Sequence, residues 1–454
     1  MSAEPLAPAK SPKFMLCLMM FLQIFIWGAW FELGFDYIPS LKFEGWQNAL
    51  IFGAFNVGAV VALLFSTQFA DRKFAAEKFL ALSHLIGGAA IMGLFFLHPA
   101  PGEKAAFWPF FALMLLHCVF YVPTVSITNS IAFANLKDPA REFGPVRVWG
   151  TIGWIAASWP FIFILVDWAK VPAMGDVGFV NWFGAMLGTS KTGADAQAAQ
   201  RYIFLVAGAA SFVLAALSPG LPHTPPKPAT DGDSFAALKA AKLLKHPFIL
   251  VLFVVTFIDA AVHQSFFYWT ASFLKSDAVR IPENWVLPVM KIGQIAEILT
   301  MLVLGYVLKN LGWRATMTLG VLGHAARFAV FAYYPEPWAA VAVNAVHGVC
   351  YAFFFATVYI FIDEFFPKDI RSSAQGLFNL LILGVGPFAA NILCGELKNM
   401  HSPGGKLEYP AVFSYSMIAG LVGALLLVLF FHPPKGVSSE PVIDKPEEHA
   451  PPVA

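Results

Sequence analysis

The sequence predicts an all-α membrane protein with twelve transmembrane helices arranged in two six-helix halves. Of its 454 residues, 58% are hydrophobic and only 13% are charged, and its mean hydropathy is +0.67. A soluble domain carries about 25% charged residues. The apolar residues fall into about twelve runs, each close to the roughly 20 residues that cross a bilayer as a helix. Composition and run length together place the chain in the membrane class.

The apolar runs divide into two sets of six. The first set lies at 14–38, 47–69, 76–97, 106–133, 146–167 and 202–218, and the second at 247–274, 286–308, 314–333, 337–362, 372–396 and 410–432. The two predicted halves are therefore 14–218 and 247–432. Between them, 219–246 begins with many Pro and Thr residues and is predicted to be a linker. The flanking segments 1–13 and 433–454 are predicted to be tails, the second of them disordered.

The lysines and arginines predict the orientation of the chain. They concentrate in one set of alternate loops, which includes Lys73, Lys137, Lys242 and Lys368. Loops rich in Lys and Arg remain in the cytoplasm. Both tails and the linker are therefore predicted to be cytoplasmic.

Several other functions are excluded by charge and motif content. A net charge of +1 argues against a nucleic-acid partner. The four cysteines, Cys17, Cys118, Cys350 and Cys394, lie inside apolar runs without zinc-type spacing, so neither a metal site nor a cofactor is expected. The sequence contains no HExxH, GxSxG or P-loop motif, which argues against an enzyme.

Polar and aromatic side chains recur on single faces of several predicted spans. On span five, Arg147, Thr151 and Trp154 follow one another at i, i+4 and i+7. Similar groups occur elsewhere: Trp27 and Trp30; Asp259, His263, Phe266 and Phe267, with Gln264 beside them; Gln294 and Glu297; His347 and Tyr351. Rings can stack on a flat solute, and amides, hydroxyls and an arginine can read its edges. The pattern suits a neutral, polar, ring-bearing solute.

Many of these side chains also have a structural interpretation. Aromatic residues in membrane helices often serve packing or interface belts. Arg147 lies near the cytoplasmic end of its span and could extend its charge to the membrane surface. Arg327 could belong to a structural ion pair, and His84 and His324 are expected to form hydrogen bonds between helices. Glu297 lies about a dozen residues into its span, a depth that favours a functional role for a carboxyl group.

Six spans on each side of a cytoplasmic linker resemble the plan of the major facilitator superfamily. That superfamily carries Gly-x-x-x-Asp-Arg-x-Gly-Arg between spans two and three, with a degenerate copy between spans eight and nine. Here "TQFADRKFAAEK" keeps Asp71 and Arg72, and "GYVLKNLGWR" keeps the glycines and Arg314, with Lys309 in the acidic position. The resemblance implies that these four charged residues act at a cytoplasmic gate.

Longer blocks resemble one family of this superfamily. "FLQIFIWGAW", "LKFEG", "VRVWGTIGW", "GQIAE", "RFAVFAY" and "IRSSAQGLF" resemble the nucleoside:H⁺ symporter family and occur in family order. The resemblance implies a transporter of the bacterial inner membrane that imports nucleosides together with protons. Because superfamily members usually work alone, it also implies a monomer.

The family's substrate contacts carry over where the motifs match. In the first half, the resemblance implies that Arg147 and Thr151 of "RVWGTIG" contact the nucleoside. Trp154 lies at a position that the family fills with an aromatic ring. Trp27, on span one, is a further ring expected to contact the substrate.

In the second half, the resemblance implies three further contacts. Gln264 matches a glutamine that binds ribose or base, and Gln294 and Glu297 of "QIAE" match binding residues on span eight. Glu297 is also the candidate proton carrier.

Two positions depart from the family pattern. On span ten the family has Tyr, followed by Phe-Asp four and five residues later, whereas this chain has His347, Tyr351 and Ala352. On span seven a family asparagine aligns with Phe267. His347, Tyr351 and Phe267 are retained as expected substrate contacts. Because the acid is absent, His347 is a second candidate for proton coupling.

Two other classes of function remain open from the sequence. A sugar or glycoside proton symporter on the same fold could use tryptophan rings to stack its substrate. A membrane receptor or an intramembrane enzyme is the third alternative, although no catalytic motif supports it.

Overall fold

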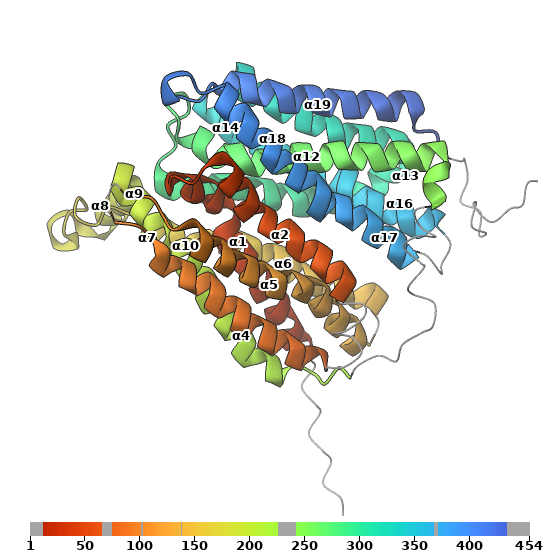
Figure 1. The fold of residues 1–454 in the computed structure, drawn as a ribbon, viewed down its shortest axis with the longest axis horizontal. Coiled ribbons are helices and arrows are strands. Elements are labelled where there is room, and N and C mark those ends of the chain that lie inside the picture. Colours follow the sequence, from red (N-terminus) through yellow and green to blue (C-terminus); the bar gives the residue numbers. More distant parts are fainter. Residues whose placement is uncertain are drawn as a thin grey trace, which may run out of the picture. The chain divides into compact units, whose positions relative to one another are not determined.

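The structure is a computed structural model that describes residues 12–65, 75–100, 103–137, 139–225, 242–366 and 371–433. The chain forms two compact units. The first comprises Met1–Ala229 with Pro282–Pro288, and the second comprises Thr230–Ile281 with Val289–Ala454. Regular structure in these described ranges is helical, apart from one isolated bridge between Val166 and Ser190 (Figure 1).

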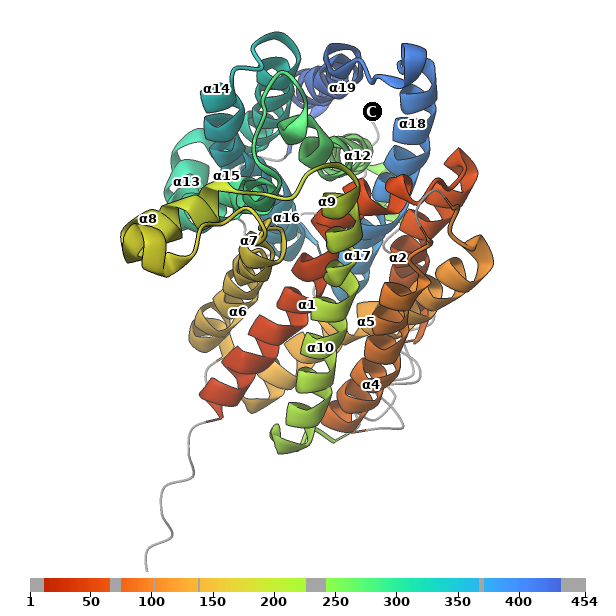
Figure 2. The same ribbon diagram turned by 90° about the vertical axis from the view of Figure 1, so that its left-hand side faces the viewer.

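The described part of the first unit contains six longer helices and several short ones. The longer helices are α1 (Lys13–Ser40), α2 (Gly45–Phe65), α4 (Ala76–Leu94), α5 (Phe107–Asn135), α6 (Pro139–Ala156) and α10 (Tyr202–Leu217). The shorter ones are η2 (Phe95–Leu97), α7 (Trp159–Ile164), α8 (Met174–Gly188), α9 (Gly193–Gln200), η3 (Ser218–Gly220) and η6 (Glu283–Trp285). Helix α1 packs against α6 and α10, and α5 packs against α2 and α4 (Figure 2).

A polar network crosses the interior of the first unit. His84 on α4 contacts Gln23 Oε1 on α1 through Nε2 and Ser211 Oγ on α10 through Nδ1, both over 2.9 Å. Gln23 Nε2 donates to Thr124 Oγ1 on α5 over 2.8 Å. Buried polar atoms need such partners where no water is available. The prediction that His84 bonds between helices is confirmed.

The second unit has a long helix at its start and a series of broken helices after it. Its elements are η5 (Leu243–Lys245), α12 (Pro247–Lys275), α13 (Val286–Tyr333), α14 (Pro337–Ala342), η7 (Val343–Ala345), α15 (Val346–Cys350), the π-helix η8 (Tyr351–Ala356), α16 (Thr357–Phe365), α17 (Arg371–Asn379), the π-helix η9 (Leu380–Val385), α18 (Gly386–Met400), η10 (Pro403–Gly405) and α19 (Tyr409–Phe430). Helix α12 packs against α18 and α19 (Figure 1). Residues of α12, α13, α16 and α19 share an apolar core that includes Leu252, Val321, Phe361 and Leu427.

Helix α13 changes direction at Gly312, which has φ 74° and ψ 175°. This positive φ is open to glycine because glycine has no Cβ to clash with the backbone. Gly312 falls between the two predicted spans 286–308 and 314–333, so the break converts one helical segment into two.

The prediction of an all-helical membrane protein is confirmed. Nine helical segments of the described residues are long and apolar enough to cross a membrane, and one of them, Glu283–Tyr333, contains two predicted spans. Helix α6 begins at Pro139, before the predicted limit of 146, so Arg147 lies about two turns inside the helix. The insertion at 167–201 forms α8 and α9. Most of the linker and both tails lie outside the described residues.

Candidate functional site

In the first unit, the predicted site residues form one face of α6 next to α1. Trp154 is buried, whereas Arg147, Thr151 and Trp27 are half-buried. The rings of Trp27 and Trp154 meet edge to face, with centroids 5.4 Å apart and planes at 88°. This is a favourable arrangement for two aromatic rings. The structure therefore brings Trp27 of span one to the face that carries Arg147, Thr151 and Trp154.

The glycines of "RVWGTIG" bring α6 against α1. A Cβ built at Gly153 would lie 2.1 Å from the carbonyl oxygen of Phe21. A Cβ at Gly150 would lie 3.0 Å from Ile24 Cγ1 and 2.5 Å from Arg147 Nη1. Small residues allow such close backbone approach between membrane helices. The motif thus provides a packing seam, and the guanidinium of Arg147 lies over the gap left by Gly150.

Trp27 carries a polar atom without a hydrogen-bond partner. Its indole Nε1 is buried and makes no hydrogen bond within the described part of the chain. Indole N–H is a donor only, and a buried donor normally has an acceptor. A solute with acceptor atoms would provide the missing partner.

In the second unit, predicted site residues from three elements surround His263. The ring of His263 on α12 lies 5.2 Å from Phe267, 5.1 Å from His347 and 6.3 Å from Tyr351, measured between centroids. Phe267 belongs to α12, His347 to α15 and Tyr351 to η8. The sequence predicted these three residues as substrate contacts, and the structure places them around one imidazole.

Arg327 determines the tautomer of His347. Its Nη1 lies 2.8 Å from His347 Nδ1, and a guanidinium only donates hydrogen bonds. His347 therefore accepts at Nδ1 and carries its hydrogen on Nε2. Arg327 is fully buried, and its carbon Cζ lies 3.8 Å from the centre of the Phe266 ring. The cation is thus held by an imidazole and an aromatic face.

The same tautomer of His347 determines the orientation of the Gln294 side-chain amide. Its Nε2 lies 3.4 Å from His347 Nε2, and its Oε1 has no hydrogen-bond partner among the described residues. Because His347 Nε2 carries hydrogen, the amide orientation that presents Oε1 to it satisfies both groups. The amide hydrogens of Gln294 are then free to donate to a solute.

The remaining predicted contacts are placed as follows. Gln264 is buried and donates from Nε2 to Asn391 Oδ1 on α18 over 3.0 Å. Glu297 is half-buried, one turn after Gln294 on α13. A Cβ at Gly348 would lie 2.5 Å from the Glu297 backbone nitrogen, so α15 packs directly on α13 at this carboxyl group.

The predicted gate residues are only partly described. Lys309 and Arg314 are exposed on either side of the break at Gly312. Asp71 and Arg72 lie outside the described residues.

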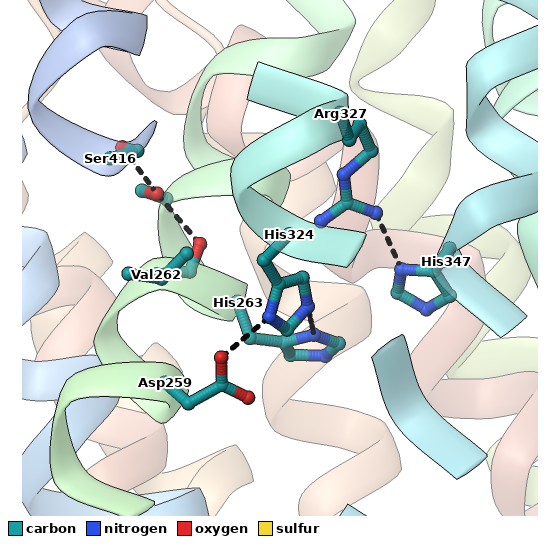
Figure 3. Close-up of polar contacts among 8 residues, drawn as sticks. Asp259, Val262, His263, His324, Arg327, His347 and Ser416 are labelled. Atoms are coloured by element: carbon teal, nitrogen blue, oxygen red, sulfur yellow. Dashed lines mark hydrogen bonds and ion pairs between the residues drawn. The ribbon is translucent and has the colours of Figure 1, made fainter. Parts of the chain in front are cut away.

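A buried cluster beside these contacts was not predicted from the sequence. His324 Nδ1 lies 2.7 Å from Asp259 Oδ1, and His324 Nε2 lies 3.4 Å from His263 Nδ1 (Figure 3). Asp259 and His324 are both fully buried. The prediction that His324 bonds between helices is confirmed. The i, i+4 spacing of Asp259 and His263 was visible in the sequence, but their partner on α13 was not.

A buried carboxyl group on α1 of the first unit was also not predicted from the sequence. Glu32 on α1 is fully buried, one turn before Asp36, which accepts a hydrogen bond from Gln200 Nε2 over 2.5 Å. Acidic residues inside membrane helices are rare and usually functional. Their depth within span one was the signal that could have identified them.

Long apolar helices that enclose clusters of polar and charged side chains are typical of membrane transporters. Residues 11–175 and 164–436 match the model of the Nucleoside H⁺ symporter family, and the chain belongs to this family. It is 28% identical to the putative nucleoside transporter YegT of Escherichia coli, over 92% of this chain and 93% of that protein. It is 27% identical to the xanthosine permease of Escherichia coli, over 92% of this chain and 94% of that protein.

Solved structures agree on the fold. The chain matches the crystal structure of the nucleoside transporter NupG with a TM-score of 0.74 and 24% identity, over 93% of this chain and all of that one (100%). It also matches a D-xylose-proton symporter with a TM-score of 0.64 and 13% identity, over 92% and 98% of the two chains. The fold therefore occurs in transporters of different solutes, and the family membership rests on the sequence.

Proposed function

We propose that this protein imports nucleosides across the bacterial inner membrane by proton symport. Membership of the Nucleoside H⁺ symporter family supports this function. The observation that carries it in the structure is the grouping of Phe267, His347 and Tyr351, from three elements, around His263. Aromatic rings beside amide and imidazole donors suit the flat base and polar edges of a nucleoside.

The proposed architecture is that of the major facilitator superfamily. Twelve spans form two six-helix halves, 14–218 and 247–432, joined by the cytoplasmic linker 219–246. Both tails lie in the cytoplasm, and the protein works as a monomer in the lipid bilayer. Alternating access exposes the substrate site first to one side of the membrane and then to the other.

Each unit contributes side chains to substrate recognition. In the first unit these are Arg147, Thr151, Trp154 and Trp27, which offer a cation, a hydroxyl group and two rings. In the second unit they are Gln264, Phe267, Gln294, Glu297, His347 and Tyr351. The unpartnered Nε1 of Trp27 and the free amide hydrogens of Gln294 support this assignment because both can donate to a nucleoside.

Proton coupling involves ionisable groups of the second unit, and gating involves charged groups of both units. Glu297 is the proton carrier that the family resemblance implies, and it lies half-buried on α13. His347 takes part in coupling if Arg327 releases its Nδ1, since that nitrogen now accepts a hydrogen bond. Lys309 and Arg314 act at the cytoplasmic gate together with Asp71 and Arg72.

Transport by purified protein in proteoliposomes tests this function. We expect labelled uridine, adenosine or xanthosine to accumulate when an inward proton gradient is imposed. Without the gradient, the internal nucleoside concentration should only reach the external one. Uptake of labelled sugars is measured in parallel, because a sugar symporter has the same fold. Uptake of a sugar in preference to every nucleoside would refute the proposed substrate, and gradient-insensitive accumulation would refute symport.

A further inference from the structure

A chain of ionisable side chains runs through the interior of the second unit. It begins at Asp259 on α12, continues through His324 on α13 to His263 on α12, and ends where His263 stacks on His347 (Figure 3). We propose that Asp259, His324 and His263 form the proton-binding site of this transporter. The proposal rests on the proposed symport function and assigns the proton to groups other than Glu297 and His347.

Asp259 and His324 form a deeply buried pair at one end of this chain. Asp259 and His324 have 0% exposed surface, and their Oδ1 and Nδ1 atoms are 2.7 Å apart. A carboxylate removed from water is costly unless paired, and ionisable groups in membrane helices usually serve transport. Asp259 Oδ2 has no hydrogen-bond partner in the described part of the chain. A purely structural pair would more commonly satisfy both carboxylate oxygens.

His263 provides a path by which a proton can reach the buried pair. Unlike the other two residues, His263 is only half-buried. Its Nδ1 is 3.4 Å from His324 Nε2, the long end of hydrogen-bond geometry. A proton added at His263 Nε2 lets the hydrogen on Nδ1 pass to His324 Nε2. His263 is then neutral again, and His324 is an imidazolium ion paired with the Asp259 carboxylate; the reverse step releases the proton.

The surrounding charges favour this site over His347. Arg327 donates to His347 Nδ1, so a proton at that atom would break the bond and place two cations together. Charged or titratable groups near the cluster come from three elements: Arg327 on α13, His347 and Cys350 on α15, and Tyr351 on η8. Asp259 supplies negative charge that stabilises an imidazolium at His324, whereas His347 has a cation as its direct partner.

The proposed proton path touches the residues that are proposed to bind the substrate. His263 lies against Phe267, Tyr351 and His347, which are proposed to bind the nucleoside. A nucleoside on these side chains would fix the ring of His263 and change its access to water. Symport requires that substrate and proton favour the same conformational change, and a shared ring supplies that connection.

The variants that test the proposal keep the buried hydrogen bonds. In His324→Asn the side-chain amide can take the place of Nδ1 and donate to Asp259, but it has no second nitrogen for the proton path. Asp259→Asn preserves shape and removes the charge. His117→Asn is the matched control, because His117 is a fully buried histidine of α5 whose Nδ1 bonds to the Gly87 carbonyl over 2.9 Å.

Two assays on the full-length protein in proteoliposomes separate binding from coupling. Counterflow of labelled uridine at equal pH needs no proton gradient, whereas accumulation under an imposed gradient does. A gradient of one pH unit with one proton per nucleoside supports about tenfold accumulation. We expect His324→Asn and Asp259→Asn to retain counterflow and to lose this accumulation, and His117→Asn to behave like the wild type.

The outcomes distinguish this inference from the proposed function. A wild type without counterflow of any nucleoside refutes the function itself. A functional wild type together with monodisperse Asp259→Asn and His324→Asn variants that still accumulate uridine tenfold overturns the proton site alone. If either variant is not monodisperse, His263→Asn decides, because it leaves the Asp259–His324 pair intact. Wild-type accumulation by His263→Asn would likewise overturn the proposal.

Discussion

Arg327 and His347 are joined by a hydrogen bond of 2.8 Å between Nη1 and Nδ1, and both side chains are almost completely buried. The arginine Nε and Nη2 atoms have no hydrogen-bond partner in the described part of the chain. This bond and the Phe266 ring are therefore the main compensation for burying the guanidinium. Removing the imidazole would leave a buried cation without its acceptor.

His347→Leu is therefore expected to destabilise the protein by about 3–5 kcal/mol, the usual result of removing one partner of a buried charge. His347→Asn is the matched control, since its amide oxygen can still accept from Arg327. Thermal unfolding in detergent, followed by tryptophan fluorescence, measures both. Equal stability of the two variants would show that the acceptor is dispensable.

The close approach of α6 to α1 gives a second prediction. Gly153→Ala would place a methyl group 2.1 Å from the Phe21 carbonyl oxygen, and the two helices would have to separate. We expect a loss of about 1–3 kcal/mol, which is typical of overpacking. Gly144→Ala on the same helix meets nothing within 4 Å and should be neutral or slightly stabilising. An unchanged melting temperature for Gly153→Ala would contradict the packing seam.

The contacts of Arg327 with His347 and of Gly153 with Phe21 show which features the sequence could predict and which it could not. The apolar runs predicted the helices because their length follows from bilayer thickness. Helical spacing correctly grouped Arg147, Thr151 and Trp154, since residues at i, i+4 and i+7 share a face whatever the fold. Spacing within one helix carries no information on its partner. Asp259 and His324 are 65 positions apart, and only the packing of α12 on α13 joins them.

The roles of small residues were equally hidden. The glycines of "RVWGTIG" were visible, but their backbone contacts depend on which helix lies opposite. Arg327 was expected to form an ion pair, whereas its hydrogen-bond partner in the structure is the neutral imidazole of His347. That choice follows from the position of α15 and could not be deduced from an isolated arginine.

Acid sensitivity of the first unit gives a third prediction. Burial, with a smaller contribution from the nearby charge of Arg201, lowers the pKa of His98 below its ordinary value. His98 Nδ1 lies 2.9 Å from the Tyr37 hydroxyl, and neutral His98 can accept this bond. Because the unfolded chain binds the proton more readily, stability is retained above about pH 6.5 and lost as the pH falls.

His98→Asn removes the titrating group and keeps an acceptor. We expect its melting temperature to fall less than that of the wild type between pH 7.5 and pH 5, by roughly 1–2 °C. His401→Asn, on the half-exposed turn after α18, provides the comparison. If wild type and His98→Asn lost the same amount over this range, His98 would not contribute to acid sensitivity.

The last prediction concerns Arg147, whose side chain either contacts the nucleoside or only extends its charge to the membrane surface. Substitutions of Arg147 distinguish these two roles. The side chain lies two turns inside α6, over Gly150 and on the face of Trp154. Arg147→Ala should weaken nucleoside binding by about 10–100-fold, the range for losing a charged hydrogen bond. Arg147→Lys should recover only part of this, because an ammonium lacks the planar fork of a guanidinium.

Calorimetric titration of the detergent-purified variants with uridine or xanthosine measures these affinities. Lys104→Ala controls for the loss of one positive charge, because Lys104 pairs with Glu44 at 3.2 Å in an exposed loop of the same unit. Its affinity should equal that of the wild type. Arg147→Ala must remain monodisperse for the comparison to hold. Wild-type affinity in that variant would assign Arg147 to the membrane surface, and would remove it from the substrate site.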